Sequence, residues 1–257
     1  MAKKVNIIKN MAHLMAIALC MLAFAFCGNY LTNTSANSDT PNITMTVSPN
    51  NNKVVFCIEG SGKITIDWGD GKVNTKWLWN FNKIHWFTHS YSGSSAYTIK
   101  ISATALRHLD CSYNQLTKLD LRANTALTSL HCWTNELTSL DVSNNIALTH
   151  LELFNNQVSN LDVSKNTALT HLYCDNNQLT ELNLSANTAL KRLNCESNNL
   201  SADALNALFE TLHNNTFEYG KTIYIADNPG TYDCDISIAE RKGWKVNTET
   251  LPPVPIF

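Results

Sequence analysis

The feature that most constrains this chain is a period of 21 residues that repeats through its central part. A leucine opens each period, and an asparagine follows it at a fixed distance. The leucine column is Leu109, Leu130, Leu151, Leu172 and Leu193, and the asparagine column is Asn114, Asn135, Asn156, Asn177 and Asn198. A register kept this long excludes chance. One period is too short to bury its own apolar face, so consecutive periods must stack into a solenoid.

Each period fits the pattern L-x-x-L-x-L-x-x-N-x-L and so resembles the leucine-rich repeat. A similar motif, such as Leu119-Asp120-Leu121, returns half a period later, which divides each coil into halves of 10 and 11 residues. We therefore expect short extended segments on both sides and almost no helix in the array. This arrangement resembles the nested-repeat class of bacterial leucine-rich proteins, in which a second Leu-x-Leu segment replaces the usual helix.

A column of cysteines runs through the same repeat. It reads Cys111, Cys132, Leu153, Cys174 and Cys195. Leucine takes the middle position, and free cysteine behaves as a small hydrophobic residue, so we interpret the column as core. Stacked disulfides or a thiolate metal site are the alternatives. We expect the asparagine column to satisfy buried backbone groups of neighbouring coils.

The N-terminus has the pattern of a secretory signal. Lys3, Lys4 and Lys9 precede an apolar run at residues 11–27, which is short for a membrane span. We predict a signal peptide at 1–26 and a polar linker at 27–42. Cleavage after Ala25 and lipidation of Cys27 in a lipobox-like segment are competing outcomes, and Phe26 stands where a lipobox has a small residue. A retained membrane anchor is a third alternative.

Charge narrows the range of partners. The chain has 19 basic and 21 acidic side chains. Loss of the predicted signal peptide would remove three lysines and no acid, which leaves a net charge of −5. Nucleic-acid-binding proteins usually carry a basic patch or stripe, so we expect no nucleic-acid partner.

Residues 43–103 lack the repeat and alternate like strands. The combination of Asp67-Trp68-Gly69-Asp70-Gly71, His89-Ser90-Tyr91 and Tyr97-Thr98-Ile99 resembles a PKD-like β-sandwich, which implies an adhesive or spacer module. The segment is also aromatic, with Trp77, Trp79, Phe81, Trp86 and Phe87. We interpret these aromatic residues as core and as packing against the first coil, in preference to a sugar-binding platform.

The array is predicted to span residues 104–200, with a C-terminal cap at 201–257. A serine N-cap and helical spacing predict a helix over 201–212 that covers the open end, followed by a strand at 221–225 and a short helix at 234–244. With the repeat blocks, this ending resembles leucine-rich-repeat surface proteins of Gram-negative gut commensals. The predicted fold is thus a mainly β solenoid, preceded by a small β-sandwich-like domain and closed by a short α/β cap.

Outward positions distinguish the two halves of each coil. Those of the first half vary and include aromatic residues and histidines, whereas those of the second half repeat small or acidic residues. Aromatic anchors dominate many interfaces, so we predict binding on the first half. The candidate residues are His131, Trp133, His150, Glu152, Phe154, His171, Tyr173 and Asp175. The alternative is that these positions vary without any ligand.

The sequence predicts no catalytic or metal site. His150 and His171 fall on adjacent coils, about 5 Å apart by strand spacing, but zinc prefers three or four protein ligands. No nucleophile elbow, zinc-protease helix or phosphate-binding glycine loop is present. We therefore expect no enzyme activity, no metal and no other cofactor.

These features together predict an exported protein that recognises an extracellular protein or glycan. It would lie at the cell surface or on the outer membrane as a lipoprotein, or else be secreted or periplasmic. A structural spacer of the bacterial envelope without a dedicated ligand is the alternative, and a hydrolase without a known motif comes third.

Overall fold

The computed structural model describes residues 42–249 apart from 49, 81, 82 and 218. The predicted signal peptide, Cys27, Phe81 and the last eight residues of the predicted cap lie outside the described residues. Within the described part, no helix is both long enough and apolar enough to span a bilayer.

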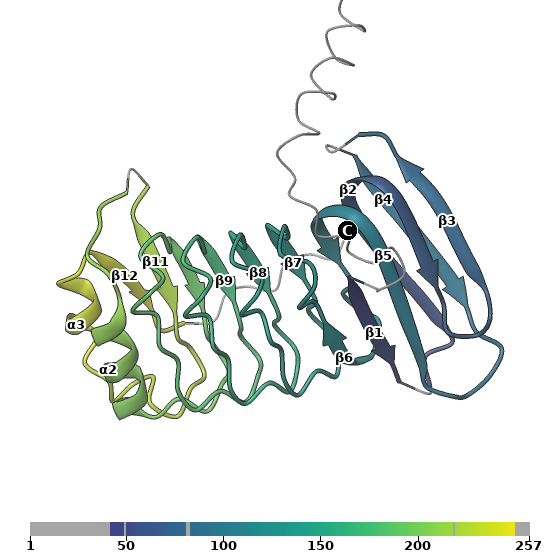
Figure 1. The fold of residues 1–257 in the computed structure, drawn as a ribbon. Helices are drawn as coiled ribbons and strands as arrows, with labels where there is room; N and C mark the ends of the chain where they lie inside the picture. Colours follow the sequence, from purple (N-terminus) through teal and green to yellow (C-terminus); the bar gives the residue numbers. More distant parts are fainter. Residues whose placement is uncertain (1–41, 49, 81–82, 218, 250–257) are drawn as a thin grey trace, which may run out of the picture. The chain divides into compact units, whose positions relative to one another are not determined.

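The described strands form a single sheet that passes from an antiparallel N-terminal region into a parallel solenoid (Figure 1). In the N-terminal region the strands are β1 (Ile43–Val47), β2 (Lys53–Asp67), β3 (Val73–Leu78), β4 (Ile84–Ser90), β5 (Tyr97–Asp110) and β6 (Leu116–Asp120). The long β2 pairs with β3, β4 and β5, and β1 pairs with β5 and β6. All the pairs of these six strands are antiparallel.

Strand β5 joins the two regions. Its first residues pair with β1, while His108, Leu109 and Asp110 pair in parallel with the first strand of the solenoid. The domain boundary predicted between residues 103 and 104 therefore falls inside a continuous strand. The domain limits remain a prediction, and what β5 establishes is that the sheet crosses this point without a break.

Four short parallel strands continue the sheet along the solenoid. They are β7 (Ser129–His131), β8 (His150–Glu152), β9 (His171–Tyr173) and β10 (Arg192–Asn194). Each central leucine pairs with the leucine 21 residues away, from Leu130 to Leu193. The prediction of a mainly β leucine-rich-repeat solenoid with almost no helix in its coils is confirmed.

The second halves of the coils differ from the first halves. Only the first coil has a strand there, β6, and the described residues of the later coils have none. Side chains supply their backbone hydrogen bonds instead. Asp141 accepts from the backbone N–H of Ser143 at 3.0 Å, and the Asn145 amide donates to the Leu121 carbonyl at 3.1 Å.

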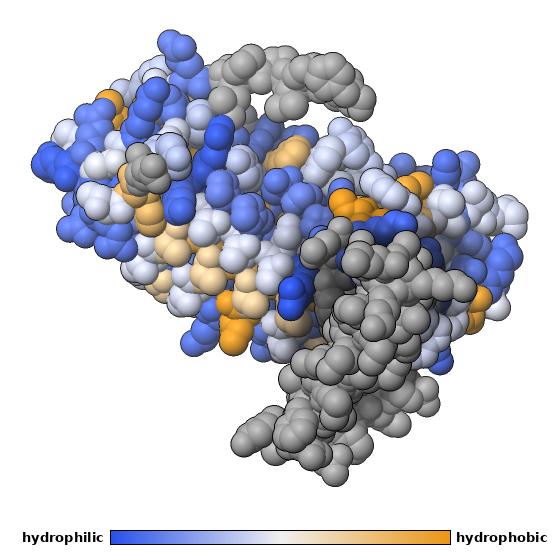
Figure 2. Space-filling view, turned by 90° about the horizontal axis from the view of Figure 1, so that it is seen from above, coloured by the Kyte–Doolittle hydropathy of each residue, from blue (hydrophilic) through white to orange (hydrophobic). Residues whose placement is uncertain are grey.

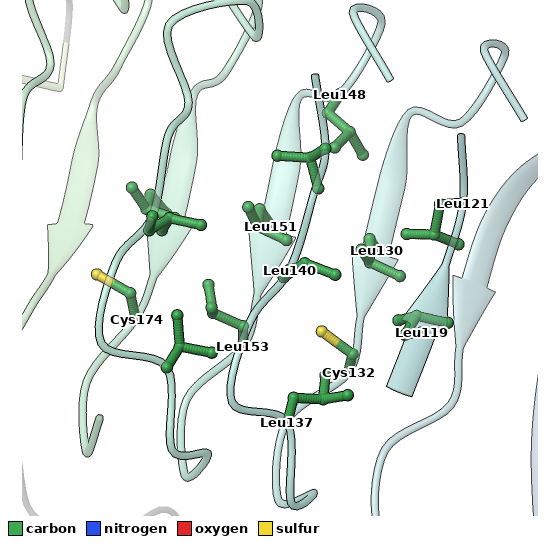
Figure 3. Close-up of a cluster of buried hydrophobic side chains, with 14 of the residues drawn as sticks. Leu119, Leu121, Leu130, Cys132, Leu137, Leu140, Leu148, Leu151, Leu153 and Cys174 are labelled. Carbon is green, nitrogen blue, oxygen red and sulfur yellow. The ribbon is translucent and has the colours of Figure 1, made fainter. Parts of the chain in front are cut away.

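The solenoid core consists of stacked columns of leucine, valine and cysteine. Figure 3 shows Cys132, Leu153 and Cys174 at equivalent positions on successive coils, each pointing inward. The four cysteines of the column are fully buried and free of disulfides. Burial raises the pKa of the Cys132 and Cys174 thiols, which therefore stay protonated. The core interpretation of this column is confirmed.

The side chains of the asparagine column form a ladder, which lies where the chain turns after the first half of each coil. Asn156 is typical: its amide oxygen accepts from the Leu137 N–H at 3.0 Å, and its amide nitrogen donates to the Cys132 and Leu153 carbonyls at 3.1 and 2.9 Å. One side chain thus satisfies backbone groups on two coils. Asn135, Asn177 and Asn198 make equivalent bonds, so the predicted role of this column is confirmed.

The C-terminal cap extends the sheet and closes the core. Its elements are α2 (Ala202–Thr211), β11 (Lys221–Tyr224), α3 (Ser237–Glu240) and β12 (Trp244–Asn247). The Ser201 hydroxyl caps α2 by accepting from the Ala204 N–H at 3.2 Å. Leu205, Leu208 and Phe209 of α2 are buried in the same core, as the helical spacing predicts.

The closing helix is shorter than predicted. The sequence favours a helix over 234–244, whereas α3 covers only Ser237–Glu240. The Asp235 carboxylate accepts from the Ser237 N–H at 3.1 Å, which places a turn before α3. Gly243, at φ +79°, then ends the helical segment and leads directly into β12.

The core interpretation of the N-terminal aromatic residues is wrong for three tryptophans. Of the four predicted aromatic residues that the structure describes, Trp77, Trp79 and Trp86 are exposed, and Phe87 packs on the core, where its ring stacks on Phe56 at 5.5 Å. Alternation along a strand shows that two faces differ, but not whether another layer covers the outer one. Here no described element covers it.

Candidate binding face

The outward residues of β5 and β7–β10 and those that follow each strand form one surface, which we call the variable face. Strand pairing aligns its residues into two columns, because directly opposed residues point to the same side of a sheet, and the residues two positions after each strand's last residue form a third. The columns are His108, Ser129, His150, His171 and Arg192; then Asp110, His131, Glu152, Tyr173 and Asn194; then Ser112, Trp133, Phe154, Asp175 and Glu196. The eight predicted binding residues all lie on this face.

An aromatic stack runs across the first coils of the variable face. The Trp133 and Phe154 rings lie 4.9 Å apart and nearly parallel, and the Tyr113 ring meets Trp133 edge-on at 4.4 Å. Because the rings cover one another, Trp133 and Phe154 are half-buried. Because the stack already holds these side chains in place, they lose less conformational entropy when a partner binds.

A threonine ladder beside the face orients two histidines. Thr149 Oγ1 donates to the Thr128 carbonyl, and Thr170 Oγ1 donates to the Thr149 carbonyl, each at 2.9 Å. A hydroxyl has one hydrogen, so each oxygen must accept from the adjacent histidine Nδ1, also at 2.9 Å. His150 and His171 therefore carry their proton on Nδ1 when neutral, which leaves Nε2 as an acceptor.

The His150 and His171 rings stack at 4.5 Å with an angle of 9° between their planes. Lone pairs of parallel rings point in parallel directions, so the two Nε2 atoms do not converge on a single ion. Among the described residues, no group of three or more histidine, cysteine, aspartate or glutamate side chains is placed to hold a metal. The stack is thus suited to hydrogen bonding and poorly suited to chelation.

Burial sets the ionisation of the variable face. Desolvation lowers the pKa of His131, His150 and His171, and it raises the pKa of Glu152 and Asp175. For Glu152, the negative charge of Asp110 raises the pKa further. His131 Nε2 lies 3.8 Å from the Glu152 carboxylate, too far for a hydrogen bond. At neutral pH these histidines are therefore mainly uncharged, so they do not neutralise the negative charge of Glu152 and Asp175.

The far end of the face includes a contact that the period does not predict. The Arg192 guanidinium lies 5.9 Å from the Tyr173 ring centroid and 5.1 Å from that of Tyr224, and it donates to the Tyr224 hydroxyl at 3.1 Å. Tyr224 belongs to β11 in the cap, where the 21-residue register is lost. In the sequence, only its place in the alternating run 221–225 pointed to Tyr224.

The opposite surface of the coils is different. Asp120, Asp141 and Asp162 each accept from the backbone N–H two residues later, and these bonds contribute to lowering their pKa. Beside α2, a groove of about 640 Å³ lies against this surface and includes Asp162 and Asp203 in its lining. Asp120, Asp141 and Asp162 hold turns together, so their repetition has a structural explanation.

Hydropathy is low over most of the described surface seen from above. Figure 2 shows mainly hydrophilic and intermediate colours there, with a thin pale orange row and a few separate hydrophobic spots. This view therefore offers no broad apolar patch among the residues coloured in it.

Similarity to known proteins is strongest in the repeat. The family model described as Leucine Rich repeats (2 copies) matches residues 104–147. No curated protein matches the sequence. The functional domain of InlJ from Listeria monocytogenes, described as including a cysteine ladder, is 31% identical over 56% of this chain and 30% of its own, with a TM-score of 0.46.

A second solved structure, an internalin (InlF) from Listeria monocytogenes, is 24% identical over 49% of this chain and 36% of its own, with a TM-score of 0.40. The chain thus spans about a third of the length of each of these two solved chains. The family match and the observed coils together show that the array is a leucine-rich-repeat solenoid.

Proposed function

We propose that this protein is an exported recognition module that binds an extracellular protein or glycan through the variable face. The observation that carries the proposal is the contrast between the two sides of the coils. One side repeats hydrogen-bonded aspartates, while the other presents the Trp133–Phe154 stack, two oriented histidines and half-buried carboxylates. Rigid aromatic residues surrounded by polar groups are typical of binding sites.

The cellular location belongs to the same proposal. A lysine-rich start and an apolar run favour export, and Cys27 would attach the protein to the outer membrane if it is lipidated. The N-terminal region would act as a PKD-like spacer or adhesive module. Replacing Cys27 with Ser and following membrane association and lipid labelling tests the anchor. A parent chain that is neither lipid-labelled nor membrane-associated, and that the Cys27→Ser change leaves unaltered, would favour cleavage after Ala25 and a secreted or periplasmic protein.

The proposed role is non-catalytic. Leucine-rich repeats serve many proteins as extended binding surfaces, and the variable face is open. A structural spacer of the envelope is the second candidate, supported by the regular ladders that hold the coils together. The two candidates differ in whether the variable face contacts another molecule.

The test is a binding screen of the mature protein against glycan arrays and host extracellular proteins. A double variant, Trp133→Ala with Phe154→Ala, removes the aromatic stack. Ile146→Ala with Tyr232→Ala is the matched control, because it removes two exposed hydrophobic side chains elsewhere. A ligand lost only with the first variant supports the proposal. A ligand retained by both moves the site off this face, and no ligand in any screen favours the spacer.

A further inference from the structure

The largest concentration of exposed apolar side chains lies outside the variable face. Nine large hydrophobic residues are exposed in the described chain, and five of them fall between residues 73 and 86. They are Val73, Trp77, Trp79, Ile84 and Trp86, with exposed fractions from 49% to 84%. Exposed apolar groups gathered in one place mark interaction sites more often than isolated ones do.

These residues line one face of the sheet, and we call four of them the tryptophan row: Trp77, Trp79, Ile84 and Trp86. Strand pairing shows on which side of the sheet these residues lie. On β2, the residue opposite Trp77 is Lys63. The residue opposite Ile84 is Glu59, and the residue opposite Trp86 is Cys57. These β2 positions are separated by even numbers of residues and therefore point the same way. Trp79 joins them by stacking on Trp77 at 5.5 Å with an angle of 19°.

The row is long and narrow. Trp86 and Trp77 lie at its two ends. Their partners on β2, Cys57 and Lys63, are six residues apart, which corresponds to about 20 Å along a strand. Trp86 and Trp77 are thus too far apart to hold one small molecule together. A line of aromatic rings at this spacing fits an extended polymer whose units repeat along its length.

Lysines outnumber carboxylates in the region of the tryptophan row. Residues 42–103 contain six lysines and three carboxylates. Lys63 lies beside Trp77 in the same face, Lys83 precedes Ile84, and neither forms an ion pair with another described residue. The local charge therefore favours an anionic ligand.

Two of the three carboxylates in residues 42–103 already have partners within the protein. Asp70 contacts His89 at 2.8 Å and Lys72 at 3.4 Å. Asp67 accepts from the Gly69 N–H at 2.9 Å. By the same register, Glu59 and Asp67 both lie in the face of the tryptophan row. Glu59 lies next to Ile84, and its other neighbour across the sheet is His108.

We propose that the tryptophan row binds a polyanionic polysaccharide. The C–H faces of successive sugar rings would pack on Trp86 and on the free outer side of the Trp77–Trp79 stack, whose electron-rich faces attract them, and Lys63 and Lys83 would pair with carboxylate or sulfate groups. This site is distinct from the candidate residues of the variable face and does not depend on them. An anionic membrane or an acidic protein segment would satisfy the lysines, but neither calls for rings spaced along a line.

The test measures binding of alginate, a polyuronate, by the folded protein without its predicted signal peptide. Dextran is the neutral control and polyglutamate the anionic control without sugar rings. The triple variant Trp77→Ala, Trp79→Ala, Trp86→Ala should weaken alginate binding about tenfold or more. Lys63→Gln with Lys83→Gln should weaken it several-fold and reduce its salt dependence.

Two control variants complete the experiment. Ile146→Ala with Tyr232→Ala and Trp133→Ala with Phe154→Ala should both bind alginate like the parent chain, even if the variable face binds nothing. Equal affinity of the triple variant and the parent would overturn the proposal, as would the absence of any alginate binding. Polyglutamate or anionic phospholipid vesicles binding as tightly as alginate would overturn the sugar specificity. Dextran binding as tightly as alginate would overturn the anionic specificity.

Discussion

Single residues in this protein are constrained mainly by the need to satisfy the backbone at each turn of a coil. The residue before each ladder asparagine has a left-handed conformation, with φ of 50° at Thr134, 54° at Asn155 and 52° at Asn176. Asparagine tolerates this region because its side chain bonds locally, whereas a β-branched residue does not. Thr134 is therefore the strained member of the series.

Replacing Thr134 with Asn should stabilise the protein by about 1 kcal/mol, because it relieves the left-handed threonine. The change adopts the residue that the next two coils already have at this position. Urea unfolding of the two proteins measures the difference. The reverse change, Asn155→Thr, should cost a similar amount, and a less stable Thr134→Asn variant would contradict the argument.

The ladder asparagines give a larger effect of opposite sign. Asn156→Ala would leave the buried Leu137 N–H without a partner and remove donors to two carbonyls. We expect a loss of about 2–4 kcal/mol in unfolding free energy, measured by chemical denaturation. Asn144→Ala is the control, since this exposed residue makes one bond to the Arg122 carbonyl, and it should cost less than about 1 kcal/mol. Equal costs would show that the ladder contributes little.

At the scale of strands and helices, columns matter more than individual elements, because β7, β8, β9 and β10 have only three residues each. The leucine, cysteine and asparagine columns were predictable from the sequence, because a period places equivalent residues on equivalent positions. The exposure of Trp77 and the short α3 were not. Whether a second layer covers a sheet, and where a local turn starts a helix, depend on contacts that periodicity does not contain.

The cysteines of the column should not react with thiol reagents while the protein is folded. Cys111, Cys132, Cys174 and Cys195 are fully buried with a raised pKa, so neither access nor thiolate is available for reaction. Maleimide labelling followed by peptide mapping should modify the half-buried Cys234 first and these four only on unfolding. Rapid native labelling of Cys132 would contradict the packing described above.

The stacked histidines should make stability depend on pH. Burial lowers the pKa of His150 and His171 below their usual 6.5, so the unfolded chain binds more protons below that pH. Stability is then lost as the pH falls from about 6.5 toward the lowered values. The variant His150→Gln with His171→Gln should lose less thermal stability between pH 7.5 and 5.5 than the parent. An identical or steeper pH dependence in this variant would rule out the stack as a cause.

At the scale of the whole molecule, one sheet connects regions that differ in chemistry. The variable face has four carboxylates and one arginine in its three columns, whereas residues 42–103 have twice as many lysines as carboxylates. The sequence predicted the solenoid and the face, because both follow the period. It did not predict that β5 continues the sheet into the N-terminal region, or that Tyr224 adds to the face from the cap. The first part of β5 and Tyr224 both lie outside the 21-residue repeat.

The proposal that the variable face binds a ligand is tested most directly by the affinity of a ligand from the screen. Hot-spot aromatic residues typically contribute about 2 kcal/mol or more, so Trp133→Ala with Phe154→Ala should raise the dissociation constant at least about 30-fold. The Ile146→Ala and Tyr232→Ala control should bind within about twofold of the parent, and circular dichroism should show all three proteins folded. An unchanged dissociation constant in a folded Trp133→Ala, Phe154→Ala protein would contradict the claim.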